Sequence, residues 1–234
     1  MDTLSRVILA TDELTLEETL TLSEKIGHRV LFKIHSLWDE HGPGVVEQLN
    51  KAGVKLVWVD LKLHDTPSTV RRRARAVRES GASFVSVHAA GEVEMMMAAL
   101  ETGIQVIAIT VPTSLTEEQA HLLHGQPSKA GVLYLARLAK LAGVKNVVCS
   151  PKEVGLLAKR PELVGMNFIT PGVRSAGVDH ADQQRVDTPA AAIKAGAKWL
   201  VVGRQITQAK DPVSALRAIE SEIEEALHAG GNPS

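Results

Sequence analysis

Eight short apolar segments, each followed by a stretch of helical periodicity, constrain the fold of this chain more than any other feature. Strands that alternate with helices are typical of a parallel sheet, because each helix carries the chain back to begin the next strand. The expected strands are residues 7–10, 30–34, 56–61, 84–87, 106–109, 147–149, 167–169 and 199–202. Eight such units predict the α/β class and a (β/α)8 TIM barrel.

A doubly wound open sheet is the alternative arrangement of the same units. A dinucleotide-binding fold of that kind carries a G-x-G-x-x-G turn after its first strand, and this chain has none there. The 234 residues suffice for one barrel, so we predict a single domain over residues 1–229 and a disordered tail over 230–234. Aromatic residues make up only 3% of the chain, which leaves Val, Leu, Ile and Ala to fill the core.

Charge gives little support for a nucleic-acid partner. The net charge is −1, and no long block of one sign is present. The basic run Arg71, Arg72 and Arg73 lies in a helical pattern beside Val70 and Val77. This arrangement indicates a solvated or interface face of a helix rather than a nucleic-acid site.

Cysteine content and hydropathy bear on the compartment. The single cysteine, Cys149, excludes an internal disulfide and indicates a reducing environment. No apolar run approaches ~18 residues, and no charged and then apolar leader precedes the first strand. We therefore expect a cytoplasmic protein with no membrane or nucleic-acid partner.

Residues suited to helix ends support the count of helices. Side chains able to accept a backbone hydrogen bond precede five expected helices, at Thr15, Thr66, Ser150, Thr188 and Asp211. In four of these cases a proline follows, as is common at the first helical position. Glycines expected as C-caps lie near the ends of five helical stretches, at Gly27, Gly53, Gly81, Gly143 and Gly196.

Acidic and basic residues gather where the strands should end. Residues two apart in a strand share a face, so Asp60 and Lys62 should point the same way, and Lys33 on the neighbouring strand should reach the same space. Active sites of these barrels form at the C-terminal ends of the strands. The row is compatible with a structural ion-pair network, or with a pocket in which carboxylates keep a lysine ionised so that it can deliver a proton.

A second cluster of signals indicates phosphate binding. Gly203 and Arg204 close the eighth strand, where barrels commonly bind phosphate. Residues 171–187 have no clear period and exceed the usual length of a barrel connection. This segment is either a disordered insertion or a closing lid, and we favour a lid that carries Arg174 and Gln183 to the phosphate.

Nine histidines raise the question of a metal site. His121 and His124 lie three apart on an expected helix, but neither is at a strand end and no carboxylate is placed as a third ligand. We therefore predict no metal. His64 is expected to orient the loop after the third strand, and His88 to support the site from behind.

Several motifs, in order along nearly the whole chain, resemble the orotidine 5′-monophosphate decarboxylase family. The most specific is Asp60-Leu-Lys62-Leu-His-Asp65-Thr-Pro67-Ser-Thr69. The others are Ile8-Leu-Ala-Thr-Asp12, Thr110-Val-Pro-Thr113-Ser, Val148-Cys-Ser-Pro-Lys-Glu153, Thr170-Pro-Gly-Val-Arg174 with Asp182-Gln183, and Gly203-Arg204-Gln-Ile-Thr-Gln208. The resemblance implies a cofactor-independent enzyme that decarboxylates orotidine 5′-monophosphate to UMP in de novo pyrimidine biosynthesis.

The resemblance also implies roles for individual residues. Asp60 would lie against the substrate carboxylate, Lys62 would protonate C6, and Lys33 would belong to the charged row. Asp65 would complete that row from the neighbouring subunit, which implies a homodimer with shared active sites. Substrate-binding roles would fall to Asp12 and Lys33 at the ribose, Thr69 from the partner, Thr113 at the pyrimidine, and Arg174, Gln183, Gly203 and Arg204 at the phosphate.

Four positions depart from the pattern of that family. Thr66 stands where isoleucine is usual, Ser68 where asparagine is common, and His35 and Ala181 where glycine is expected. These departures put substrate fit and lid closure in question, but they remove no charged catalytic group. The alternatives are a Mg²⁺-dependent sugar-phosphate decarboxylase or aldolase that shares D-x-K-x-x-D, and a nucleotide-phosphate-binding barrel without turnover.

Overall fold

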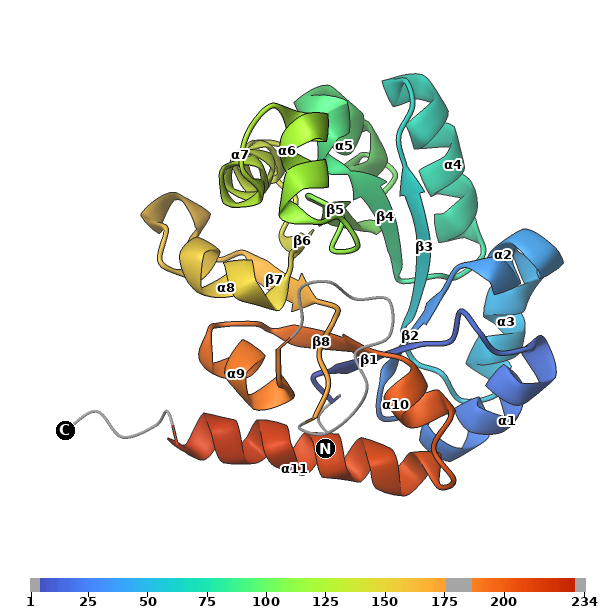
Figure 1. Cartoon of the computed structure of the whole chain (residues 1–234). Helices are drawn as coiled ribbons and strands as arrows, with labels where there is room; N and C mark the ends of the chain where they lie inside the picture. The colour runs from blue at the N-terminus through green and yellow to red at the C-terminus, as the bar shows by residue number, and fades with distance from the viewer. Residues whose placement is uncertain (1–4, 176–186, 230–234) are drawn as a thin grey trace.

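Eight parallel strands close into a barrel in the computed structural model, which describes residues 5–175 and 187–229 (Figure 1). The strands pair in chain order, and β1 closes the ring by pairing with β8. They are β1 (Val7–Ala10), β2 (Leu31–Ile34), β3 (Val57–Leu63), β4 (Phe84–His88), β5 (Gln105–Ile109), β6 (Asn146–Val148), β7 (Asn167–Thr170) and β8 (Trp199–Val202). The predicted (β/α)8 barrel is confirmed, and every strand boundary lies within two residues of its expected position.

Helices surround the ring of strands (Figure 1). They are α1 (Leu16–Ile26), α2 (Ser36–His41), α3 (Gly44–Lys51), α4 (Pro67–Glu79), α5 (Glu92–Leu100), α6 (Glu117–His124), α7 (Ser128–Leu141), α8 (Pro151–Ala158), α9 (Pro189–Lys194), α10 (Arg204–Thr207) and α11 (Pro212–Ala229). Two short 3₁₀ helices, η1 (Ala89–Gly91) and η2 (Pro161–Leu163), lie between them. Within the described ranges, no helix is long and apolar enough to cross a membrane.

Two apolar layers hold the barrel together. Alternate side chains of each strand point inwards and outwards, so one layer fills the barrel and the other packs the strands against the helices. The inner layer consists of Ile8, Leu31, Trp58, Phe84, Ile107, Ile109, Val148, Ile169 and Val201. The outer layer is larger and built mostly from Val, Leu, Ile and Ala, as the composition predicts.

The expected helix caps are confirmed with one exception. Thr15, Ser150, Thr188 and Asp211 each accept a backbone hydrogen bond from the first turn of their helix. The prediction for Thr66 is wrong in this respect, since its hydroxyl donates to Thr69 Oγ1 at 3.1 Å and makes no cap bond. Gly27 is the C-cap of α1, with a right-handed φ of −59°. The other four expected glycines have positive φ and each follows the C-cap of its helix by one residue.

The two ends of the expected lid are held together. Val173 and Asp187 form an isolated parallel bridge, and the Arg174 amide donates to the Asp187 carbonyl at 3.1 Å. Gln183 and Ala181 lie outside the described residues, as does the tail 230–234. The predictions for these positions therefore stay predictions.

Candidate active site

A cavity of about 520 Å³ opens at the C-terminal ends of the strands. The predicted site residues that line it are Asp12, Lys33, Asp60, Lys62, Thr113, Arg174, Gly203 and Arg204. Glu13, Trp58 and His88 also contribute to its wall. The cavity thus collects residues from both ends of the chain, because parallel strands present their carboxyl ends at one rim of the barrel.

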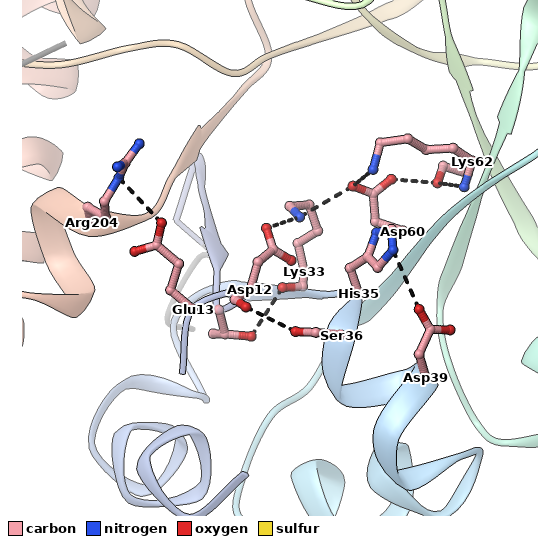
Figure 2. A network of polar contacts seen from close by, with 11 residues as sticks. Asp12, Glu13, Lys33, His35, Ser36, Asp39, Asp60, Lys62 and Arg204 are labelled. Carbon is pink, nitrogen blue, oxygen red and sulfur yellow. Dashed lines mark hydrogen bonds and ion pairs between the residues drawn. The ribbon is translucent and has the colours of Figure 1, made fainter. Parts of the chain in front are cut away.

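The central feature of the cavity is a continuous row of alternating charges (Figure 2). Lys33 Nζ, at the end of β2, lies 2.6 Å from Asp12 Oδ2 and 3.3 Å from Asp60 Oδ2. Asp60 Oδ2 also accepts a hydrogen bond from Lys62 Nζ at 2.8 Å. One carboxylate oxygen therefore faces two ammonium groups, and Lys33, Asp60 and Lys62 share one space, as the sequence predicts.

Burial and charge oppose each other in setting the ionisation of this row. Burial alone would raise the pKa of Asp60, but the positive charges of Lys33 and Lys62 outweigh it and hold that pKa below its ordinary value. Burial alone would lower the pKa of Lys33, but Asp60 and Asp12 outweigh it and raise that pKa above its ordinary value. Lys33 and Asp60 therefore favour each other's charged form.

Exposure distinguishes the two lysines. The side chain of Lys33 is 9% exposed and that of Lys62 is 40% exposed, although both contact the same carboxylate. Lys33 is therefore a mostly buried counter-charge to Asp12 and Asp60, whereas the ammonium of Lys62 is more accessible to a molecule in the cavity.

Lys62 reaches this position through an unusual backbone conformation. Its φ is +47°, in the left-handed region, and the pairing of β3 with β4 shifts register between Val59 and Leu63. The simple alternation predicted for Asp60 and Lys62 is therefore wrong for the backbone, although both side chains do reach the same space. A side chain in this region costs about 1–2 kcal/mol, and such strain is concentrated at functional sites.

Asp65 and Thr69 do not belong to the cavity of their own chain. Neither lines it, and the Asp65 side chain is exposed with Oδ1 accepting a hydrogen bond from the Thr66 amide at 2.6 Å. The single chain thus unites Lys33, Asp60 and Lys62 and leaves the fourth expected catalytic residue at the surface.

Of the residues expected at the phosphate, Arg174, Gly203 and Arg204 line the cavity, and Gly203 and Arg204 directly follow β8. Arg204 Nε lies 3.6 Å from Glu13 Oε1 (Figure 2). The side-chain Nε2 of Gln208 donates to the other oxygen of Glu13 at 3.1 Å. Arg174 is buried and donates to the Val173 carbonyl at 2.7 Å. Two arginines therefore line the cavity, and a guanidinium group is suited to binding a dianionic phosphate.

Sequence reasoning misplaced one residue and overlooked another. His35 does not line the cavity, and its ring lies 3.6 Å from Asp39 in the same helical turn. Ser86 was overlooked, although its hydroxyl donates to Asp60 Oδ1 at 2.6 Å. The available signal was the alternation of β4, which places Ser86 on the inward face between Phe84 and His88.

Two histidines lie near the row, and His88 is at the cavity wall rather than behind the site as expected. The rings of His64 and His88 lie 5.6 Å apart, and His88 reaches the cavity wall. Burial, followed by the nearby His64 and Lys62, lowers the pKa of His88. This lowered pKa favours the neutral form of the His88 imidazole.

Comparison with known proteins identifies relatives of this chain. The profile of the family described as "Orotidine 5'-phosphate decarboxylase / HUMPS family" matches residues 5–219. An orotidine 5′-phosphate decarboxylase of Nitrosococcus oceani is 40% identical over 233 residues, which cover 94% of this chain and 97% of the relative. The one from Anaeromyxobacter dehalogenans is 44% identical over 189 residues, covering 78% and 82%. The crystal structure of the Lactobacillus acidophilus orotidine 5′-phosphate decarboxylase superposes with a TM-score of 0.79 at 31% identity, covering 94% of this chain and 99% of that one.

Proposed function

Because the chain belongs to the orotidine 5′-phosphate decarboxylase / HUMPS family, we propose that it converts orotidine 5′-monophosphate to UMP and CO₂ in de novo pyrimidine biosynthesis. The observation that carries the proposal is the Lys33–Asp60–Lys62 row at the wall of the cavity. We also propose that it acts without a cofactor, in the cytoplasm, as a homodimer.

The chemistry of this reaction requires what the row can supply. When the bond between C6 and the carboxylate breaks, the electron pair stays on C6 as a vinyl carbanion that no adjacent carbonyl can delocalise. A preorganised cation at C6 stabilises the charge as it develops and costs no reorganisation at that moment. Lys62 is the exposed lysine, so its ammonium can both provide this charge and transfer a proton to C6. The resulting neutral amine then regains a proton from solvent.

Asp60 has a different task in this mechanism. Its ionised carboxylate holds the ammonium of Lys62 at 2.8 Å and would lie close to the carboxylate that leaves as CO₂. Repulsion between the two carboxylates weakens in the transition state, because the negative charge of the substrate moves from the departing carboxylate onto C6 and CO₂ leaves as a neutral molecule. Because Lys33 and Lys62 keep its pKa low, Asp60 stays ionised where protonation would otherwise relieve this repulsion.

The remaining substrate contacts follow the family assignment. We propose that Asp12 and Lys33 bind the ribose hydroxyls, that Thr113 reads the pyrimidine edge, and that Asp65 and Thr69 enter the site of the partner subunit. The exposed position of Asp65, and the absence of both Asp65 and Thr69 from the wall of their own chain's cavity, support the last proposal. The phosphate would be bound by Arg174, Gln183, Gly203 and Arg204.

A Mg²⁺-dependent sugar-phosphate decarboxylase or aldolase is the alternative enzyme. Such an enzyme binds its enediolate intermediate on a cation, which needs carboxylates free to act as ligands. Here Asp60 Oδ2 is engaged by Lys62 and Lys33, at 2.8 and 3.3 Å. Lys62 belongs to the D-x-K-x-x-D motif that both enzymes share, but Lys33 lies outside it. The Lys33 ammonium beside this oxygen disfavours a divalent cation there and favours the nucleotide reaction.

A turnover assay tests the proposal. Purified protein is mixed with orotidine 5′-monophosphate, with and without excess EDTA, and UMP and CO₂ are quantified. We expect one UMP per CO₂ and the same rate in both mixtures. A rate abolished by EDTA and restored by Mg²⁺ would favour the metal enzyme. Calorimetric binding of UMP without any turnover would favour a binding barrel.

A further inference from the structure

Ser86 is a buried polar residue on the inward face of β4. Its relative exposure is 0%, and it lies between Phe84, in the apolar filling of the barrel, and His88, at the cavity wall. Ser86 itself does not line the cavity. A hydroxyl in such a place needs partners, since an unbonded buried polar group destabilises the fold.

The Ser86 hydroxyl bonds to two parts of the charged row. It donates to Asp60 Oδ1 at 2.6 Å and accepts from the Lys62 backbone amide at 3.0 Å. The other Asp60 oxygen, Oδ2, faces the ammonium groups of Lys62 and Lys33. Ser86 thus fixes the rotation of the carboxylate so that one oxygen is presented to both lysines.

The same hydroxyl acts on the strained backbone of Lys62. This amide lies where β3 and β4 shift register, and the residue has a φ of +47°. The Lys62 amide donates a hydrogen bond to the Ser86 hydroxyl, and this bond connects the left-handed turn at Lys62 to β4. If the Ser86 hydroxyl were removed, the Lys62 backbone would lose a hydrogen bond that favours its strained conformation over ordinary extended backbone.

We propose that Ser86 is a positioning residue for the decarboxylation, one that aims the Lys62 ammonium by holding its backbone and orienting Asp60. The inference rests on the proposed function but concerns a residue that touches neither the cavity nor the substrate. A merely structural serine would affect folding alone. A positioning serine affects the catalytic step and leaves nucleotide binding intact.

The test compares Ser86→Ala and Ser86→Thr with the control Ser23→Ala. Ser23 is 1% exposed and donates to the Thr19 carbonyl at 2.6 Å, remote from the row, so its variant loses a buried serine hydroxyl without touching the site. For Ser86→Ala we expect kcat to fall by about 10- to 100-fold, the range that small misplacements of a reacting group produce. KM and the Kd for UMP should stay within about twofold, because uniform binding is unchanged. Ser86→Thr keeps the hydroxyl and should recover part of the lost rate.

A pH profile adds a readout that loss of folding would not move. The Ser86 hydrogen bond favours the ionised form of Asp60, so its loss should shift the acid limb of the kcat profile to higher pH. A Ser86→Ala kcat no lower than that of Ser23→Ala, or an unshifted acid limb, would overturn the proposal. Should Ser86→Ala fail to fold, Ser86→Cys replaces it, and a wild-type kcat in that variant would overturn the proposal equally.

A spectroscopic measurement separates this proposal from the proposed function. Protein with ¹³C-labelled lysine gives a side-chain signal for Lys62, assigned with Lys62→Ala. We expect Ser86→Ala to move or split that signal and Ser23→Ala to leave it in place. An unmoved signal in Ser86→Ala would count against the positioning role. Absence of turnover in the wild type would count against the proposed function alone.

Discussion

Replacement of Lys33 by methionine should destabilise the barrel in a pH-dependent manner. Methionine has a similar length and no charge, so Lys33→Met removes the ammonium between Asp12 and Asp60 with little change in packing. Asp60 then stays buried, with a side chain 5% exposed, and keeps only Lys62 as a counter-charge. The side chain of Asp12 is 40% exposed and can turn towards solvent, so its loss of Lys33 adds little to the destabilisation.

The expected loss follows from the burial of Asp60. Removing one partner of a buried ion pair lowers the free energy of unfolding by about 3–5 kcal/mol. Because Asp60 keeps its contact with Lys62, we expect Lys33→Met to lower it by about 3 kcal/mol. With an m-value of about 3 kcal/mol per molar for a chain of this size, the urea midpoint should fall by about 1 M at pH 7.

The sign of the pH effect provides a further check. In the wild type the pKa of Asp60 is lowered, so its stabilisation is present above the pKa of the unfolded chain and is lost as pH falls through the folded value. In Lys33→Met the pKa of Asp60 in the folded state rises, so the ionised carboxylate stabilises the variant less, and acidification removes less stability from it. The difference in free energy of unfolding between the wild type and the variant should therefore be largest near neutral pH and decrease towards pH ~4 and below.

Urea unfolding followed by circular dichroism, at several pH values, measures both effects. Lys51→Met is the control, because it breaks a 2.7 Å pair with Glu47 in which both side chains are largely exposed, and no shift of the midpoint is expected. The double variant Lys33→Met/Asp60→Asn should recover much of the loss, since it removes the uncompensated charge. A double variant no more stable than the single one, or a deficit independent of pH, would refute the reasoning.

Three further predictions concern activity. Lys62→Ala should abolish decarboxylation while UMP still binds in calorimetry; retained turnover would remove Lys62 from its role as proton donor. Arg204→Ala should lower kcat/KM sharply for the full nucleotide and little for a phosphate-free substrate, whereas equal losses would mean that the arginine does not bind phosphate. Lys62→Ala and Asp65→Ala, each inactive alone, should recover about a quarter of wild-type activity when refolded together, because half of randomly formed dimers are hybrids with one intact site of two. Hybrid dimers without activity would show that Asp65 does not act across the interface.

Local sequence patterns were sufficient for the strands and for most helix ends. Residues 7–10 and 199–202 have the boundaries expected from their apolar runs, and Thr15 caps α1 through its own side chain. Each of these features depends on residues a few positions apart, where periodicity and capping preferences act directly. The charges at the strand ends were recognisable for the same reason, since parallel strands bring their carboxyl ends to one rim.

What only the tertiary structure decided lies between strands. The hydrogen bond of Ser86 to Asp60 joins residues 26 positions apart, and the left-handed turn at Lys62 accompanies a register shift that β3 alone does not encode. Asp65 follows Lys62 by three residues yet lies outside the cavity. The sequence by itself determined the order of strands and helices and the charges at the strand ends. Register, strain and the direction of individual side chains were set by closing the ring, because they depend on how neighbouring strands pack rather than on the period of any one strand.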